Sequence, residues 1–377
     1  MTRIYLDHAA TTPMAKEVIQ LYTEEMNAEF GNASSIHQTG RRARKKLDNA
    51  RNILAASIAA HETEITITSG GTEADNYAIF GTAYARVNDG RHIITTQIEH
   101  HAVLHACEQL EREGFDVTYL PVNQNGVIDI NDLKNSLRED TILVSVMYGN
   151  NEVGSIQPIR EIGALLKDHP AYFHTDAVQA YGSISLDVNE LQVDLLSVSS
   201  HKINGPKGIG FLYQRKGLLL KPLFYGGQQE RKKRAGTENV PAIVAFAKAV
   251  EIKQQNMEQS IGYFQQLKQL FLERLKEQGV PFKVNGQVEV SLPHVVNISI
   301  PKTDIETFLV QLDLAGIDAS SGSACTAGSI DPSHVLVAMF GENTPELRNS
   351  IRFSFGISNT EQQAIEAAQK ISKIILK

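Results

Sequence analysis

The sequence predicts an α/β protein built around a mostly parallel sheet. Short apolar runs alternate with longer helical segments through the first two-thirds of the 377-residue chain. Strands that alternate with helices are typical of βαβ units, in which crossover helices join parallel strands. The length suggests about two domains. We place a large domain at residues 13–258 and a smaller α+β domain at residues 1–12 and 259–377.

The strands of the large domain are expected where β-branched and apolar residues cluster. They are Ile65–Thr68, His92–Thr96, Val117–Leu120, Thr141–Tyr148, Tyr172–Asp176, Asp194–Ser199 and Gly208–Tyr213. The helices between them include Glu73–Val87, Ala102–Glu113 and Ile159–Lys167. Because parallel sheets bind ligands beyond the carboxyl ends of their strands, the polar residues after each strand are the candidates for a site.

A stretch without proline spans the predicted boundary between the two domains. Apolar residues at helical spacing in Ala242–Gln278 predict one long helix that bridges the two domains. The elements expected after it are Val295–Ile300, Glu306–Leu314, Ser350–Phe355 and the amphipathic Thr360–Leu376.

Composition narrows the class of protein. The net charge of −7 argues against a broad surface for nucleic acid. The sequence contains no run of 18 apolar residues, so no membrane span is predicted, and the first residues lack the apolar segment of a signal peptide. Two cysteines, Cys107 and Cys325, cannot form a disulfide framework, so we expect a reducing, cytoplasmic location.

A glycine-rich segment, Thr68-Ser-Gly-Gly-Thr-Glu-Ala-Asp75, follows one predicted strand and opens a helix. Glycines let backbone N–H groups approach an anion, and a helix N-terminus favours negative charge, so the segment suits a phosphate. The alternative is a tight strand-to-helix turn with a threonine cap. The patterns of P-loop and dinucleotide-binding proteins do not occur in the chain.

Two further strands deliver groups suited to cofactor chemistry. Asp176 ends a strand, where it could pair with a protonated ring nitrogen or cap a helix. Lys202 follows another apolar strand, where loss of water would lower its pKa as Schiff-base chemistry requires. Lys207 competes for that role but lies in a Gly/Pro turn, and the alternative is that both lysines are ordinary surface residues.

The segment Glu99–Cys107 is rich in histidine. His101 and His105 have the i,i+4 spacing of metal ligands, with Cys107 close by. A metalloprotease would need glutamate directly after the first histidine, and Ala102 stands there. The alternatives are a histidine that stacks on a planar cofactor and a polar helix start with solvated imidazoles.

Cys325 lies among small residues in Ser320-Ser-Gly-Ser-Ala-Cys-Thr-Ala-Gly-Ser329. This composition predicts an exposed thiol on a mobile loop, the setting of a reactive nucleophile. His334 could supply an imidazole, so a Cys–His hydrolase is one alternative, and a flexible loop with an unused thiol is another.

The last two candidates are a basic segment and a single arginine. In Arg231–Asn239 the charges read as a solvated face, whereas Gly236-Thr237 could bind a phosphate oxygen. Arg352 stands in an otherwise apolar strand, where it needs either a substrate carboxylate or a structural ion pair.

Taken together and in order, these motifs resemble the cysteine desulfurases of the NifS/IscS type, in the first of that family's two groups. The likeness runs from end to end, and Ser199-Ser-His-Lys202 together with Ser321-Gly-Ser-Ala-Cys325 is its most specific part. Further matching segments are Tyr5–Pro13, Thr68–Asn76, Glu99–Leu104, Asn150–Gly154, Asp176 with Gln179, and Arg234–Thr237. The departures are small: Ala33 stands where proline is usual, and His8 where asparagine or tyrosine is common.

The resemblance implies pyridoxal 5'-phosphate (PLP), the fold-type-I, aminotransferase-like architecture of class-V aminotransferases, and a homodimer. Lys202 would hold PLP as a Schiff base, Asp176 would pair with the ring nitrogen, His100 would stack on the ring and assist proton transfer, and Gln179 would bind the ring hydroxyl. The phosphate would be held by Gly71, Thr72, Ser199 and His201, with Thr237 reaching in from the other subunit. Asn151, beside the cofactor, and Arg352 would bind the carboxylate of L-cysteine.

The implied reaction leaves a persulfide on Cys325 and releases L-alanine, a cysteine desulfurase activity of the EC 2.8.1.7 type. The sulfur would then pass to an iron–sulfur scaffold or a tRNA thiouridylase. We expect no intrinsic metal, although Cys325 could share an iron–sulfur ligand role with a scaffold, and neither membrane nor direct nucleic-acid binding. The alternatives are a selenocysteine lyase or aminotransferase of the same fold, a sulfur carrier without catalysis, and the Cys–His hydrolase.

Overall fold

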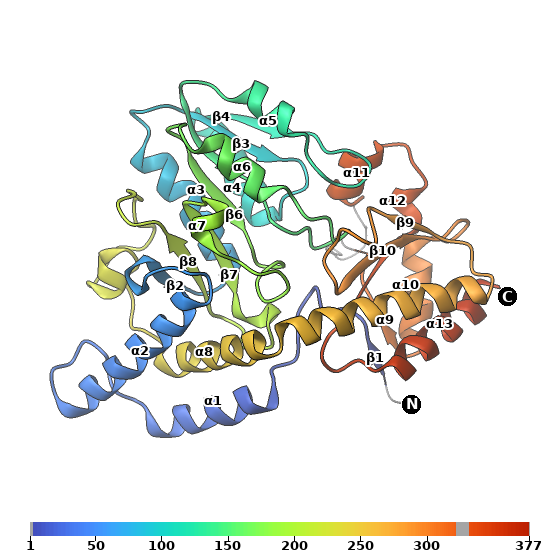
Figure 1. Ribbon diagram of the computed structural model, residues 1–377, viewed down its shortest axis with the longest axis horizontal. Coiled ribbons are helices and arrows are strands. Elements are labelled where there is room, and N and C mark those ends of the chain that lie inside the picture. Colours follow the sequence, from blue (N-terminus) through green and yellow to red (C-terminus); the bar gives the residue numbers. More distant parts are fainter. Residues whose placement is uncertain (1–2, 322–331, 377) are drawn as a thin grey trace.

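A computed structural model describes residues 3–321 and 332–376 (Figure 1). Its centre is a seven-stranded sheet in the order β2-β8-β7-β6-β5-β3-β4, in which only β8 runs antiparallel to its neighbours. The strands are β2 (Ile65–Thr68), β3 (His92–Thr96), β4 (Asp116–Leu120), β5 (Thr141–Ser145), β6 (Tyr172–Asp176), β7 (Leu195–Ser199) and β8 (Gly210–Gln214). The prediction of a mostly parallel α/β sheet is therefore confirmed.

Both faces of this sheet are buried, as parallel sheets require. Neighbouring residues on one strand point to opposite faces, so Ile93 joins one hydrophobic cluster and Ile94 another. The first cluster contains α3 (Gly71–Ala85) and α4 (His101–Arg112). The second contains α2 (Gln38–Ala56), α6 (Ile159–Leu166) and α8 (Val240–Gln255).

Six further helices belong to this part of the described chain. They are α1 (Lys16–Ala28), α5 (Ile130–Ser136), α7 (Val188–Leu191) and the 3₁₀ helices η1 (Glu62–Glu64), η2 (Ser200–Lys202) and η3 (Gln229–Lys232). Helix α1 packs beside α8 at the lower edge of the view in Figure 1.

The prediction of a single helix over Ala242–Gln278 is wrong, because the structure has two helices there. Helix α8 ends at Gln255, and α9 (Met257–Glu277) begins after Asn256, whose ψ of 12° leaves the helical range. Together they run from the central sheet to the C-terminal part of the molecule (Figure 1).

The C-terminal part has its own hydrophobic cluster, which includes Leu6, Phe271 and Phe353. It contains the antiparallel sheet β12-β10-β9 and the parallel pair β1-β11. The elements are β1 (Ile4–Tyr5), β9 (Lys283–Asn285), β10 (Val295–Ser299), α10 (Ile305–Leu314), β11 (Ile317–Asp318), α11 (His334–Phe340), α12 (Glu346–Asn349), β12 (Ser350–Ser354) and α13 (Glu361–Ile375). The domain boundaries at residues 13 and 258 stay a prediction.

Within the described residues, no helix is both long and apolar enough to cross a membrane.

Candidate functional site

A cavity of about 390 Å³ opens at the carboxyl ends of the parallel strands. Its walls come from segments that follow β2, β3, β5, β6 and β7, together with the N-terminal segment and β12. The cavity therefore collects the residues that the sequence placed after separate strands. The predicted residues that line it are Gly71, Thr72, His100, Asn151, Asp176, Gln179, Ser199, His201, Lys202 and Arg352.

Lys202 lies on η2, directly after β7, with its amine held at the cavity. Its Nζ donates hydrogen bonds to the backbone oxygens of Ala9, at 2.5 Å, and Ala10, at 2.9 Å. Burial, together with the nearby charge of Arg352, lowers the pKa of Lys202 to about 8. The amine is therefore far more easily deprotonated than a solvated lysine, as a nucleophilic or basic lysine must be.

Asp176 and Gln179 stand on the neighbouring strand end. Oδ1 of Asp176 accepts a hydrogen bond from the Val178 N–H at 2.8 Å, and burial raises its pKa to about 6. Nε2 of Gln179 donates to the Ala9 oxygen at 2.9 Å, so Gln179 and Lys202 share one acceptor. A cation beside Asp176 would stabilise its ionised form.

The glycine-rich turn brings the start of α3 to the cavity. Gly70 has φ +151° and ψ −172°, a conformation open essentially to glycine alone. At Gly71 an added Cβ would lie 2.8 Å from Cγ2 of Val178, so a side chain there would force the stiff Val178 side chain or the backbone to shift. The first N–H groups of α3, which have no partner within the helix, thus belong to a segment that borders the cavity.

His100 is the N-cap of α4 and is uncharged at neutral pH. Its Nδ1 accepts a hydrogen bond from Ala102 N–H at 3.1 Å, which leaves the ring proton on Nε2. Burial, and the nearby positive charge of Lys202, lower its pKa to about 4. The imidazole is therefore a neutral aromatic ring on the wall of the cavity.

The other histidines of this segment form a ring cluster outside that cavity. His101 stacks on His105 with ring centroids 4.9 Å apart, and it lies 4.7 Å from the ring of His334. Cys107 is buried in the core, and burial raises the pKa of its thiol. The described residues contain no group of three side chains placed to hold a metal ion, and Cys107 is a core residue.

Arg352 lines the cavity and also forms a structural ion pair. Its Nη2 lies 2.6 Å from Oδ1 of Asp7, and Nη1 donates to the Asn151 backbone oxygen at 2.9 Å. The Nε of Arg352 is buried and has no hydrogen-bond partner among the described residues. Asp7 thus neutralises part of the charge that a substrate carboxylate would use.

Of the predicted residues that the structure describes, Thr237 does not line this cavity. Thr237 lines a separate cavity of about 90 Å³ beside Thr68 and Gly208. Cys325 lies outside the described residues.

The structure also adds residues that sequence reasoning did not select. Asp75 lines the cavity from α3 and is buried. Its Oδ1 lies 3.6 Å from Nε2 of His174 and has no hydrogen-bond partner among the described residues, whereas the carboxyl group forms a hydrogen bond with Ser197. The backbone oxygens of Ala9 and Ala10 are likewise part of the site. The acid inside the glycine-rich motif was the only signal for Asp75, and nothing in a sequence marks a carbonyl oxygen.

The residues present fit PLP. One cavity is bordered by a cradle at Gly71 that a Cβ would crowd, a buried amine at Lys202 and a buried carboxyl at Asp176. These groups match the phosphate, aldehyde and ring nitrogen of that cofactor.

Comparisons with protein families, related sequences and solved structures all identify the same family. The family model "Aminotransferase class-V" matches residues 4–366. IscS 1 of Bacillus subtilis (strain 168) is 57% identical over 375 residues, which cover 100% of this chain and 99% of that protein. The cysteine desulfurase IscS of Dictyoglomus turgidum is 46% identical over 376 residues, covering 99% and 95% of the two chains. A solved NifS-like protein superposes with a TM-score of 0.93 at 35% identity and full coverage of both chains. The chain therefore belongs to the class-V aminotransferase family and, within it, to the PLP-dependent cysteine desulfurases of the NifS/IscS type.

Proposed function

We propose that this cavity holds PLP and L-cysteine, and that the chain converts L-cysteine to L-alanine while Cys325 takes the sulfur. The observation that carries the proposal is the meeting of Lys202, Asp176 and Arg352 at one cavity: an amine of lowered pKa, a buried carboxyl and a guanidinium. A noncatalytic sulfur carrier has no need of the first two groups, and a Cys–His hydrolase needs none of them.

Different residues would hold the phosphate and the ring of the cofactor. Gly71, Thr72, Ser199 and His201 would bind the phosphate, Gln179 the ring hydroxyl and Asp176 the ring nitrogen, with His100 against the ring face. His201 is held in place by a contact of 3.1 Å between its Nδ1 and Oγ1 of Thr11. When bound, PLP supplies an electron sink that makes the α-proton of the amino acid acidic and the bond to sulfur weak.

The chain's own groups then act on the substrate. Arg352 and Asn151 would hold the carboxylate of L-cysteine, and the neutral form of Lys202 Nζ would take the proton from its α-carbon. The thiolate of Cys325 would attack the substrate sulfur. Its S–S bond forms as the C–S bond breaks, and the β-carbon gains a proton. L-cysteine and a thiol thus become L-alanine and a persulfide.

The same proposal covers the surroundings of the enzyme. We infer a cytoplasmic homodimer in which Thr237 of one chain completes the phosphate site of the other. The persulfide would pass its outer sulfur to an iron–sulfur scaffold or a tRNA thiouridylase, and any RNA contact would be made by that acceptor because this chain carries a net charge of −7. Binding of tRNA by the isolated protein at physiological salt would contradict the last point.

The test is the formation of alanine from L-cysteine in the presence of a reductant. We expect alanine from the wild type and none above background from Cys325→Ala or Lys202→Ala. Cys325→Ala should retain the visible absorbance of bound PLP, whereas Lys202→Ala should lose it, so the two defects are separable. Alanine produced by Cys325→Ala at the wild-type rate would refute the role of Cys325.

A further inference from the structure

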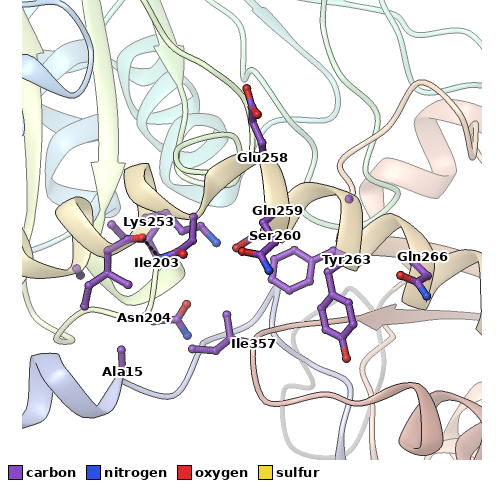
Figure 2. Close-up of a pocket in the computed structure, with 15 residues that line it drawn as sticks. Ala15, Ile203, Asn204, Lys253, Glu258, Gln259, Ser260, Tyr263, Gln266 and Ile357 are labelled. Atoms are coloured by element: carbon purple, nitrogen blue, oxygen red, sulfur yellow. Dashed lines mark hydrogen bonds between the residues drawn. The ribbon is translucent and has the colours of Figure 1, made fainter.

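A second, larger cavity lies away from the active site, where the central part of the molecule meets the C-terminal part. It has a volume of about 660 Å³ and lies between α8, α9, the start of α1 and the segment that follows Lys202 (Figure 2). Its apolar walls include Ile203, Ile252, Phe264 and Ile357. Small-molecule sites in proteins have this size and this mostly apolar lining.

One cation, Lys253, lies on the wall of this cavity without an ionic partner. Its side chain extends from α8 (Figure 2), and its Nζ lies 5.2 Å from the ring centroid of Phe264 on α9. In the described part of the chain it forms no ion pair. Among the described residues that line the cavity, Glu258 is the only acidic one, and in Figure 2 its carboxylate points away from Lys253. A half-buried lysine without a counter-ion is costly unless an anion from outside joins it.

The surroundings of Lys253 strengthen this demand for an anion. Lys253, Lys268, His8 and Lys202 are close enough to His294 for their charges to lower its pKa, in addition to the larger effect of burial. Within the described chain, the amine of Lys268 donates to neutral groups only: Oγ of Ser291 at 2.9 Å and the backbone oxygens of Leu292 and Val288 at 3.0 and 3.3 Å. Burial lowers the pKa of Lys253 to about 8, with no carboxylate acting to raise it. The junction therefore holds two lysines, Lys253 and Lys268, that no carboxylate of the described chain neutralises, and the cavity lies beside the first of them.

We propose that this cavity binds a small amphipathic anion, a carboxylate or sulfonate on an aromatic or branched apolar body, with Lys253 as its charge partner. The apolar body would lie against Phe264, Ile252 and Ile357, and amide groups such as Gln259 would face the polar end. The ligand would also touch Ile203 and Asn204, which directly follow Lys202 in the chain. This site is independent of the desulfurase function proposed above.

The experiment uses the PLP-loaded protein and 8-anilinonaphthalene-1-sulfonate as the probe, with binding measured by calorimetry. We expect one site per chain in the wild type and at least about tenfold weaker binding in Lys253→Met, because a charge-assisted contact is lost. Lys248→Met is the matched control: Lys248 lies on the same helix, pairs with Glu251 at 3.5 Å and does not line the cavity. It should bind the probe as the wild type does.

Two further measurements separate the parts of the proposal. Ala249→Phe fills the cavity while leaving Lys253 in place, and it should abolish binding. The neutral analogue N-phenyl-1-naphthylamine should bind the wild type and Lys253→Met equally weakly. Unaltered sulfonate binding in Lys253→Met or Ala249→Phe, or its absence from the wild type, would overturn the proposal. The PLP content and the melting temperature of each variant show whether it is folded.

Discussion

Asp75 and Asp176 are two buried carboxyl groups on the wall of one cavity, and they cannot both ionise cheaply. Burial, and then the charge of Asp176, raise the pKa of Asp75 well above its usual value. We expect Asp75 to keep its proton, so that Asp176 can carry the charge that the cofactor ring needs. Asp75→Asn, which mimics the protonated acid, should therefore hold PLP within a few-fold of wild type in equilibrium dialysis. Asp176→Asn should bind it at least about tenfold more weakly. Equal losses in the two variants would contradict this division of roles.

Glu99 offers a prediction on pH and stability. Its side chain is fully buried, Oε1 accepts from Met147 N–H and Thr96 Oγ1 at 2.8 Å each, and Oε2 has no partner among the described residues. Burial raises the pKa of Glu99 from 4.5 to about 8. The folded protein thus holds this proton more tightly than the unfolded chain, so stability falls as the pH rises from about 4.5 to about 8.

Glu99→Gln removes that proton equilibrium while keeping an acceptor for Met147. Between pH 5 and pH 8, the free energy of unfolding of the variant should rise relative to that of the wild type. The rise should be at least about 1 kcal/mol, which corresponds to a pKa shift of about one unit. Melting curves at the two pH values give the comparison. A constant difference between the proteins would show that Glu99 does not titrate in this range.

The candidate site shows which residues a sequence can reveal. Asp176 ends a predicted strand, and Lys202 and Gly71 each follow one, so the rule that parallel strands end at one edge was enough to bring them together. For Arg352 the sequence is compatible with a substrate contact or an ion pair; the structure shows the ion pair with Asp7 and places Arg352 on the cavity wall, and the substrate contact stays a prediction. The sequence does not reveal Asp75 as a site residue, because its importance comes from three neighbours that only folding brings near it: Asp176, His174 and Ser197.

At the scale of elements, one buried ion pair joins α2 to the segment before α8. Arg51 and Glu230 are both buried, with two contacts of 2.7 Å, and Oε2 of Glu230 also accepts from Ile67 N–H on β2 at 2.9 Å. Glu230 has φ 47°, a left-handed conformation that this pair holds in place. Removing one partner leaves a buried charge without compensation.

Arg51→Met should therefore lower the free energy of unfolding by about 3–5 kcal/mol, measured by urea denaturation. The double variant Arg51→Met/Glu230→Gln should be more stable than the single one, since it removes the stranded charge and keeps the acceptor for Ile67. The exposed pair of Arg160 and Glu190, 2.6 Å apart, is the control, and Arg160→Ala should leave the free energy of unfolding nearly unchanged because solvent screens this pair. Similar losses at the two sites would refute the distinction.

The division of the expected bridging helix shows where element prediction fails. Apolar residues continue at helical spacing from α8 into α9, so periodicity alone predicts one helix. The helices bury different surfaces: α8 is buried on most sides, including Ile243 and Phe246, whereas α9 buries one stripe that includes Leu267 and Phe271. Tertiary packing on two separate cores sets the break at Asn256, a weak helix former, and no local pattern reports it.

At the scale of the whole molecule, exposed apolar side chains bear on the proposed homodimer. Phe30 and Ile36, between α1 and α2, are 87% and 90% exposed. Apolar groups this exposed are candidates for a subunit interface. We expect a dimer mass by sedimentation, and the double variant Phe30→Asp/Ile36→Asp should dissociate at a concentration at least about tenfold higher. Leu314→Asp is the control, because Leu314 is 82% exposed on α10 in the C-terminal part. An unchanged association would place the interface elsewhere.

Thr237 gives the sharper test of assembly, because within one chain it lies in its own small cavity and not with Lys202. If it acts across the subunit interface, Thr237→Asp places a carboxylate against the partner's phosphate site, whereas Lys202→Ala disables only its own chain. A mixed dimer of the two variants then has one intact site, with Lys202 from the first chain and Thr237 from the second. Random pairing should restore about a quarter of wild-type alanine formation from two inactive proteins. If Thr237 acts within its own chain, no pairing contains an intact site, and the mixture stays inactive while its PLP content and dimer mass show that assembly has occurred.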